Sequence, residues 1–338
     1  MDISDSSVAA IPPVGKGRGA KGRSCRKRAT VFCACGSEEG ACSRGCCCAR
    51  RCWLWTLGAT AVLAAAVLLC LRLAGYLTPP PPLPAACALP WPGCAEFDAS
   101  GWSRVLARHA TAPAAVLRRG VNFTGLDYAG VAADADFARF CALLEATDVA
   151  ALNRSSQAAF FVNAYNALAV RMVLEHPCGA AYCGSIRDIT ANAGLQTVWK
   201  MRAGTLAGRG YTLDNIEHDT LRAALLAGDA RVHAALNCAS VSCPDLAQSS
   251  FALRAGTLDA DLDAAARAWL ANDAKGLALE GGGALLRLSR IFHWYGGDFA
   301  PSAQAWAAQY APPPLRAAAR AAAAVDFFGY DWGLNSAA

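Results

Sequence analysis

Residues 160–174 read FFVNAYNALAVRMVL, and this stretch decides the fold of the C-terminal part of the chain. Its markedly polar groups are two asparagines, one arginine and the Tyr165 hydroxyl. A helix that is apolar on nearly all faces is buried, so the pattern predicts a central helix over about 156–175. Asn163 and Asn166 are three apart and share one face of that helix. Because buried amides need hydrogen-bond partners, they either clamp a neighbouring loop or face a polar site.

The segments around this helix predict an α+β fold, mostly helical with a small sheet, for the globular domain over 97–338. A glycine triplet between LALE and LLRLS predicts a hairpin around 281–283. The apolar pattern predicts a buried strand at 231–237 and further helices at about 134–146, 213–227, 258–272 and 303–325.

Residues 53–71, WLWTLGATAVLAAAVLLCL, form an uncharged run long enough for a transmembrane helix, which we expect over 53–76. A buried core helix and a cleaved secretory signal are the alternatives. Residues 1–52 carry ten Lys or Arg against four Asp or Glu, and after Arg72 the next basic residue is Arg104. The positive-inside rule then predicts a single-pass membrane protein with a cytosolic N-terminus and a lumenal or extracellular C-terminal domain.

The flanks of this run fit the same interpretation. Residues 1–52 lack an apolar period and are predicted to be a disordered, basic, Cys-rich tail. Cys46, Cys47, Cys48 and Cys52 are plausible palmitoylation sites there, while a zinc cluster of Cys33, Cys35, Cys42 and Cys46 is the rival. A proline-rich stalk covers 77–96. The chain carries +5 overall and the tail +6, so the near-neutral remainder excludes a nucleic-acid partner and leaves the lipid bilayer.

Two sequons and seven cysteines lie beyond the apolar run. Asn122 and Asn153 each begin an Asn-x-Ser/Thr sequon, which is compatible with a glycoprotein. The seven cysteines are Cys87, Cys94, Cys141, Cys178, Cys183, Cys238 and Cys243. The close pairs Cys87–Cys94 and Cys178–Cys183 are candidate disulfides, although spacing alone does not fix the connectivity.

Two segments carry groups suited to chemistry. In TLDNIEHDTLR (212–222), His218 and Arg222 share one helical face, and Glu217 points elsewhere. In DARVHAALNCASVSCP (229–244), the predicted strand leads from His233 into a Ser/Cys-rich loop, a common place for catalytic groups. Cys238 and Cys243 are then structural thiols or a disulfide, or one is a nucleophile with His218 or His233 as base. A zinc site of these two cysteines and two histidines is the third option.

Five segments together resemble the domain of unknown function 547 family over roughly 125–333. They are residues 160–174, 212–222, 229–246, LSRIFHWYGGDF (288–299) and YDWGLN (330–335). The resemblance implies a shared α+β domain without a settled activity. Its polar positions correspond here to Asn163, Tyr165, Asn166, Glu217, His218, Arg222 and His233. Plant members that lack the two cysteines argue against a family-wide mechanism that needs Cys238 or Cys243.

Two function hypotheses remain open from the sequence. The first is a thiol- or His-dependent hydrolase or transferase, with catalytic groups among Glu217, His218, His233, Cys238 and Cys243. In it, the side chains that bind or orient are Asn163, Tyr165, Asn166 and Arg222. The second is a non-catalytic module that binds a small molecule, a peptide or another protein. The sequence identifies no cofactor and no metal.

Overall fold

The computed structural model describes residues 47–73, 79–89, 93–95, 97–251 and 257–337. These divide into two units, 1–68 and 69–338, which are described separately. The described residues of the first unit lie in helix α1 (Cys47–Leu73). Residues 1–46 of the predicted disordered tail, which include the zinc alternative, lie outside the described part. The prediction of disorder is wrong for residues 47–52, because they form the first turns of α1.

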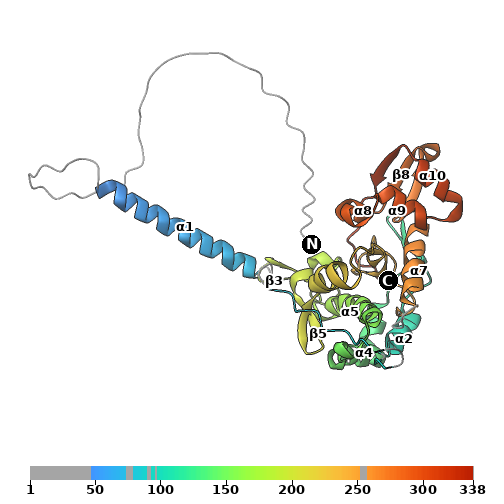
Figure 1. Cartoon of the computed structure of the whole chain (residues 1–338), viewed down its shortest axis with the longest axis horizontal. Coiled ribbons are helices and arrows are strands. Elements are labelled where there is room, and N and C mark those ends of the chain that lie inside the picture. The colour runs from blue at the N-terminus through green and yellow to red at the C-terminus, as the bar shows by residue number, and fades with distance from the viewer. Residues whose placement is uncertain (1–46, 74–78, 90–92, 96, 252–256, 338) are drawn as a thin grey trace, which may run out of the picture. The chain divides into compact units, whose positions relative to one another are not determined.

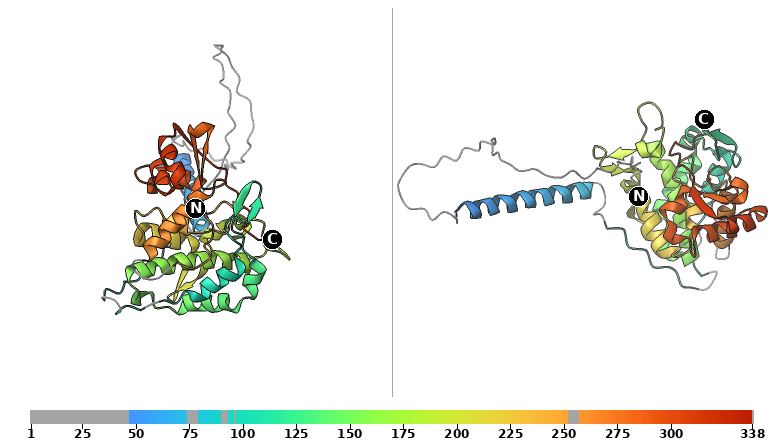
Figure 2. Two further views of the ribbon diagram at one scale, coloured as in Figure 1. Left: turned by 90° about the vertical axis from the view of Figure 1, so that its right-hand side faces the viewer. Right: turned by 90° about the horizontal axis from the view of Figure 1, so that it is seen from above.

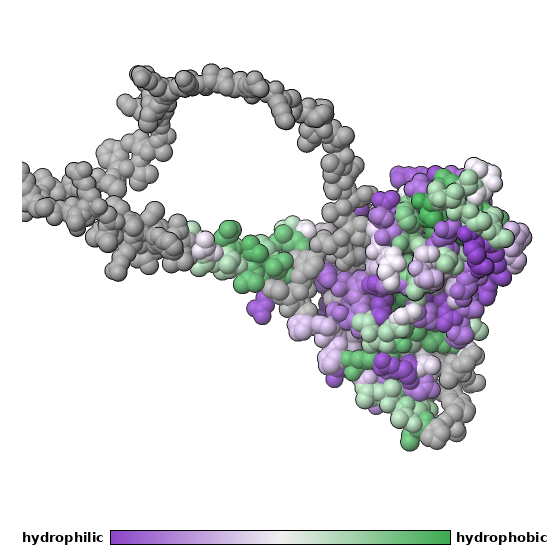
Figure 3. Space-filling model, turned by 45° about the horizontal axis from the view of Figure 1, so that its top comes forward, coloured by the Kyte–Doolittle hydropathy of each residue, from purple (hydrophilic) through white to green (hydrophobic). Residues whose placement is uncertain are grey.

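The prediction of a transmembrane helix requires correction. Among the residues that the structure describes, no helix combines the length and the apolar character needed to cross a membrane. The described side chains of α1, from Ala59 to Leu73, are exposed and include the charged Arg72. Most of this exposed stretch is hydrophobic (Figure 3). The transmembrane helix over 53–76 and the single-pass localisation are therefore wrong for the described part of the chain.

The second unit is built around helix α5. The elements up to this helix are α2 (Ser100–His109), β1 (Val116–Arg118), β2 (Val121–Phe123), α3 (Tyr128–Ala133), α4 (Ala135–Ala146), the 3-10 turn η1 (Val149–Ala151) and α5 (Arg154–Glu175). The Asn153 side chain caps α5 by accepting a hydrogen bond from the Ser156 N–H at 2.9 Å. Because α5 is apolar on nearly every face, it is buried from Ser156 to Val170, as the sequence predicts.

Short hairpins and a π-helix pack beside α5. They comprise η2 (Ile186–Asp188), β3 (Thr190–Ala191), β4 (Gln196–Thr197), η3 (Val198–Lys200), β5 (Arg202–Leu206), β6 (Arg209–Thr212), η4 (Asn215–Leu225) and α6 (Val232–Ala235). The predicted helix at 213–227 is confirmed in position, but η4 is a π-helix that packs on α5. The predicted strand at 231–237 is wrong. Asp229 accepts from the Arg231 N–H at 3.0 Å and starts a turn, and the alanine-rich residues that follow form α6.

The last elements form a three-stranded sheet with covering helices. They are α7 (Leu258–Ala271), β7 (Leu277–Glu280), η5 (Gly281–Gly283), β8 (Leu285–Leu288), α8 (Arg290–Trp294), η6 (Gly296–Asp298), α9 (Ala303–Tyr310), η7 (Pro313–Leu315), α10 (Arg316–Ala321) and β9 (Ala324–Phe327). The predicted hairpin is confirmed as the antiparallel pair β7–β8, to which β9 adds in parallel. The predicted single helix over 303–325 is wrong, because the prolines at 312–314 break it into α9 and α10.

This sheet and its helices lie at one end of the unit, and α4 and β5 lie at the other (Figures 1 and 2). An aromatic cluster fills the sheet end, where the Trp269 and Phe292 rings stack with centroids 4.9 Å apart. About half of the described residues are helical and the sheets among them are small, so the α+β prediction holds for this unit. The candidate disulfides Cys87–Cys94 and Cys178–Cys183 are both formed.

Candidate functional site

The two asparagines of α5 hold neighbouring loops. The Asn163 amide accepts from the Phe251 N–H at 2.9 Å and donates to the Phe251 carbonyl at 3.0 Å. Asn166 accepts from the Asn237 N–H at 2.8 Å and donates to the Ala235 carbonyl at 3.0 Å. Both amides are buried, and each pairs with one backbone N–H and one backbone carbonyl of a neighbouring loop. Of the two roles left open by the sequence, the contacts fit the clamp.

A second group of polar side chains centres on Asp298. His233 donates from Nε2 to Asp298 Oδ2 at 2.7 Å, and Arg222 donates from Nε to the same oxygen at 2.8 Å. The bond from His233, assisted by the one from Arg222, outweighs burial and lowers the pKa of Asp298 to about 2. Arg222 also contacts His218 Nδ1, and because a guanidinium only donates, His218 must accept there. The two histidines are thus linked through Arg222 and Asp298.

His233 is poorly placed to exchange protons with a substrate. Its side chain is 3% exposed and lies between the rings of Tyr295 and Phe299, with centroids 4.5 and 5.4 Å away. Arg222 covers the Tyr295 ring at 4.5 Å. His233 therefore contributes to the packing between α6 and η6, and its ring is too buried to exchange protons readily with solvent.

Glu217 points into the interior from η4. Tyr165 donates to Glu217 Oε2 at 3.1 Å, and both side chains are buried. Burial raises the pKa of Tyr165 well above its usual value, and the neighbouring Glu217 charge adds to the effect. Tyr165 therefore remains a hydrogen-bond donor at neutral pH. This contact agrees with the expectation that Glu217 points away from His218.

The Ser/Cys-rich loop holds two unpaired cysteines. Cys238 and Cys243 are both reduced and buried, so the disulfide alternative between them is wrong. Cys243 Sγ accepts from the Cys238 N–H at 3.1 Å and from the Tyr330 hydroxyl at 3.2 Å, and lies 3.5 Å from Ser240 Oγ. Cys238 Sγ lies 3.0 Å from Ser240 Oγ. The two sulfurs therefore share a small set of hydrogen-bond donors.

These contacts separate the acidities of the two thiols. Burial acts to raise the pKa of Cys243, but hydrogen bonds from Cys238, Tyr330 and Ser240 outweigh it and lower this pKa to about 6. The hydrogen bond to Cys243, together with burial, raises the pKa of Cys238 well above its usual value. These contacts therefore favour the thiolate on Cys243 over the thiolate on Cys238.

The C-terminal segment fixes this loop. The Val241 N–H donates to the Gly333 carbonyl at 2.8 Å, and the Asn335 N–H donates to the Ala239 carbonyl at 3.0 Å. Asp331 N–H donates to Ser242 Oγ at 2.8 Å. Ala239 has a φ of 63°, in the left-handed region that residues other than glycine seldom adopt. The loop is thus held in a specific conformation by residues far along the chain.

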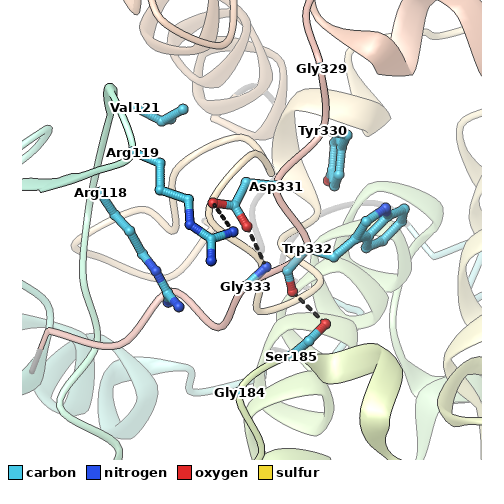
Figure 4. A pocket seen from close by; sticks show the side chains of 10 residues that line it. All are labelled: Arg118, Arg119, Val121, Gly184, Ser185, Gly329, Tyr330, Asp331, Trp332 and Gly333. Atoms are coloured by element: carbon cyan, nitrogen blue, oxygen red, sulfur yellow. Dashed lines mark hydrogen bonds and ion pairs between the residues drawn. The ribbon is translucent and has the colours of Figure 1, made fainter.

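A pocket of about 720 Å³ opens beside this segment, and Tyr330 forms part of its wall (Figure 4). Arg118 and Arg119 enter from the β1–β2 hairpin, opposite the rings of Tyr330 and Trp332. Ser185 Oγ donates to the Trp332 carbonyl at 2.7 Å and fixes the base of the wall. Because the Tyr330 hydroxyl also contacts Cys243, this tyrosine touches both the pocket and the sulfur.

The structure thus divides the predicted site residues into separate groups. Described hydrogen bonds join His218, Arg222 and His233 through Asp298, and join Tyr165 to Glu217, whereas those of the two thiols go to other partners. None of the nine predicted residues lines the pocket. Within the described part of the chain, no group of three or more His, Cys, Asp or Glu is placed to hold a metal. The four-ligand zinc alternative therefore has no support.

Sequence reasoning missed four of the residues that make these contacts: Ser240, Tyr295, Asp298 and Tyr330. Three of them stand in the segments 288–299 and 330–335, which carry part of the family resemblance. The presence of these segments together with the others was the signal that could have identified the three residues, because each segment supplies a contact partner to a residue far away in the sequence.

The second unit is therefore an α+β domain with buried polar contacts around a central helix. Residues 149–270 match the model of a family described as "Protein of unknown function, DUF547". This match supports the domain family for that part of the chain, and it covers the three segments between 160 and 246 that carry the resemblance. No curated protein and no solved structure matches the chain.

Proposed function

We propose that this domain is a thiol-dependent hydrolase or transferase whose nucleophile is Cys243. The observation that carries the proposal is an unpaired sulfur that accepts two hydrogen bonds, from the Cys238 N–H and the Tyr330 hydroxyl. These bonds hold the pKa of Cys243 at about 6 despite its burial. Thiolates, and not thiols, are the nucleophiles of cysteine enzymes. On this proposal the hydrogen bonds to Cys243, and not a histidine base, favour its thiolate form.

The chemistry that follows is acyl transfer. The thiolate attacks the carbonyl carbon of an ester, a carbon–sulfur bond forms, and the bond to the alcohol oxygen breaks with its electron pair, after which the alkoxide takes a proton from water. Water then attacks the thioester, which releases the acid and restores the thiolate; another acceptor in place of water makes the reaction a transfer. The strained φ of Ala239 supports a role for the loop beyond packing, because such strain gathers at functional sites.

Tyr330 positions the reacting sulfur. Its ring forms part of the pocket wall and its hydroxyl donates to Cys243 at 3.2 Å. Burial raises the pKa of Tyr330 well above its usual value, so the hydroxyl keeps its proton. A substrate entering from the pocket meets Tyr330 before it meets the sulfur. Movement of this ring is therefore part of the proposal.

The polar groups around Asp298 and Glu217 have supporting roles in this proposal. Asn163 and Asn166 hold the loops that frame the site, and Tyr165 fixes Glu217. His218 and Arg222 are partly exposed, at 24% and 22%, and lie on the same exposed side of η4. Because neither lines the pocket, we assign them to holding Asp298 and η4 in place, and not to activation of the thiol.

The test is covalent capture with p-nitrophenyl acetate, whose leaving group needs no proton. We expect a burst of p-nitrophenolate from the full-length protein and an acetyl group on Cys243, located by peptide mass spectrometry. The Cys243→Ser variant should lose the burst, and the Cys141→Ser variant, the matched control for a free cysteine elsewhere, should keep it. Circular dichroism spectra confirm that both variants are folded. A burst that is equal in both variants, or acetyl found on Cys141 alone, contradicts the proposal.

The alternative function is a non-catalytic binding module. One observation favours it: the pocket is open to solvent, whereas Cys243 is 3% exposed behind Tyr330. On this alternative the folded protein binds a ligand in the pocket but never acquires an acetyl group. The capture experiment therefore distinguishes the two functions.

A further inference from the structure

The pocket walls carry an excess of positive charge. Arg118 and Arg119 stand on one side, and Asp331 is the acidic residue among those that line the pocket. A third arginine, Arg187, lies over the Trp332 ring with its guanidinium carbon 5.3 Å from the ring centroid. The balance of these charges favours an anion, because a concave surface of one sign concentrates ligands of the other.

The two arginines retain donors for a ligand. A guanidinium has five N–H donors, and among the described contacts Arg118 donates one hydrogen bond, from Nη1 to the Leu334 carbonyl at 3.2 Å. Arg119 is 75% exposed, and its Nη1 lies 3.8 Å from Asp331 Oδ2, which is too long for a hydrogen bond. Asp331 therefore attracts Arg119 toward the pocket without occupying its donors.

The opposite wall offers aromatic surface. The ring of Trp332 packs against Tyr330 with centroids 4.4 Å apart and against Trp294 with centroids 5.5 Å apart. The Ser185–Trp332 hydrogen bond fixes the backbone of Trp332. Figure 4 shows the two arginines on one side of the pocket and the rings of Tyr330 and Trp332 on the other. A flat or apolar group fits against the rings while a charged group reaches the arginines.

We propose that this pocket binds an organic anion whose carboxylate or phosphate contacts Arg118 and Arg119 and whose ring or apolar body packs on Trp332. The inference rests on the proposed function in one respect: it assigns this ligand as the acyl substrate of Cys243. Tyr330 links the two, because it forms part of the pocket wall and donates to the sulfur. A substrate held this way presents its uncharged end toward the thiolate.

The experiment is calorimetric titration of the full-length Cys243→Ser protein with three probes: N-acetyl-phenylalanine, its carboxamide, and phenyl phosphate. We expect the acid to bind at least about tenfold more tightly than the carboxamide, because charge-assisted bonds to arginine are the strong ones. Binding should weaken as salt rises. Tighter binding of phenyl phosphate than of the acid identifies phosphate as the preferred anion, and the reverse order identifies carboxylate.

Arg119→Gln should weaken binding of the preferred anion at least about tenfold, whereas Arg139→Gln, at another exposed arginine, should leave it unchanged. Equal binding of acid and carboxamide with no affinity for phenyl phosphate, or equal binding in the two variants, overturns the inference. Failure here while Cys243 is still acetylated leaves the thiol chemistry standing. Anion binding without acetylation of Cys243 supports the pocket as an anion site and contradicts the proposed thiol chemistry.

Discussion

The acidity of Cys243 can be tested directly by alkylation of the native full-length protein with iodoacetamide between pH 5 and pH 10. Cys141 is an internal control, since it is also unpaired, and burial raises its pKa to about 11. The pKa of Cys243 is lowered to about 6. The rate at Cys243 should therefore level off above about pH 7, while the rate at Cys141 should rise roughly tenfold per pH unit to pH 10.

The expected difference in rate follows from two opposing effects. At pH 7.5 the thiolate fraction is about 0.97 for Cys243 and about 0.0003 for Cys141, a ratio of about 3,000. The less basic thiolate is intrinsically less nucleophilic, by about 100- to 300-fold over this gap in pKa. Cys243 should therefore react about 10- to 30-fold faster than Cys141 where access is equal. The shape of the pH profile is the stricter criterion, because access changes the height of the curve and not its midpoint.

Peptide mass spectrometry of quenched samples measures each cysteine separately. A Cys238→Ser variant tests the contribution of the neighbouring thiol. The bonds that remain, from the Tyr330 and Ser240 hydroxyls and the backbone N–H of residue 238, should still keep the midpoint at Cys243 below the usual thiol range. The reasoning is refuted by a Cys243 profile that still rises between pH 8 and pH 9. It is equally refuted if Cys243 reacts only after the protein is unfolded.

Three further predictions concern stability. Asp298→Asn should lower the free energy of unfolding by about 1–2 kcal/mol at pH 7, because hydrogen bonds from His233 and Arg222 lose their charged, partly exposed partner. Since the pKa of Asp298 is lowered to about 2, this difference should persist above about pH 4 and shrink as the pH falls toward 2; urea denaturation that shows an equal gap at pH 7 and pH 2 contradicts this. Asn166→Ala should cost about 2–3 kcal/mol, measured by the same denaturation, because two buried backbone groups lose partners, and an unchanged midpoint would exclude the clamp. Replacing both members of the Cys178–Cys183 disulfide by serine should cost about 2 kcal/mol through the freed loop, visible by scanning calorimetry as a lower melting temperature.

Local sequence patterns correctly predicted the elements that are determined by residues close together in the chain. The apolar run around α5 and the glycine turn between β7 and β8 are both where the sequence places them. The amide clamps were one of two roles left open, and the close cysteine pairs were correct candidates. The mistaken strand at 231–237 shows the limit of periodicity, because a short apolar run serves a strand and a buried helical turn equally well.

The contacts within the candidate site could not be predicted in this way, because they join segments that only the topology of the fold brings together. Asp298 meets His233 across 65 positions, and Tyr330 meets Cys243 across 87. Spacing within either segment carries no information about the other. The same limit explains why His218 and His233 looked like partners of the thiols, while their hydrogen bonds go to Arg222 and Asp298.

The pairing of loop 239–242 with residues 331–335 has a consequence for biosynthesis. Ser242 and Asp331 are 89 positions apart, so at about 5–20 residues per second the ribosome needs roughly 4–18 s to add the partner of a loop already made. During that interval the two thiols have neither the tyrosine hydroxyl nor the backbone carbonyls that will fix them. The nascent protein therefore carries ordinary cysteines at 238 and 243 first, and the contacts that make Cys243 more acidic form only after residues 330–335 have been made.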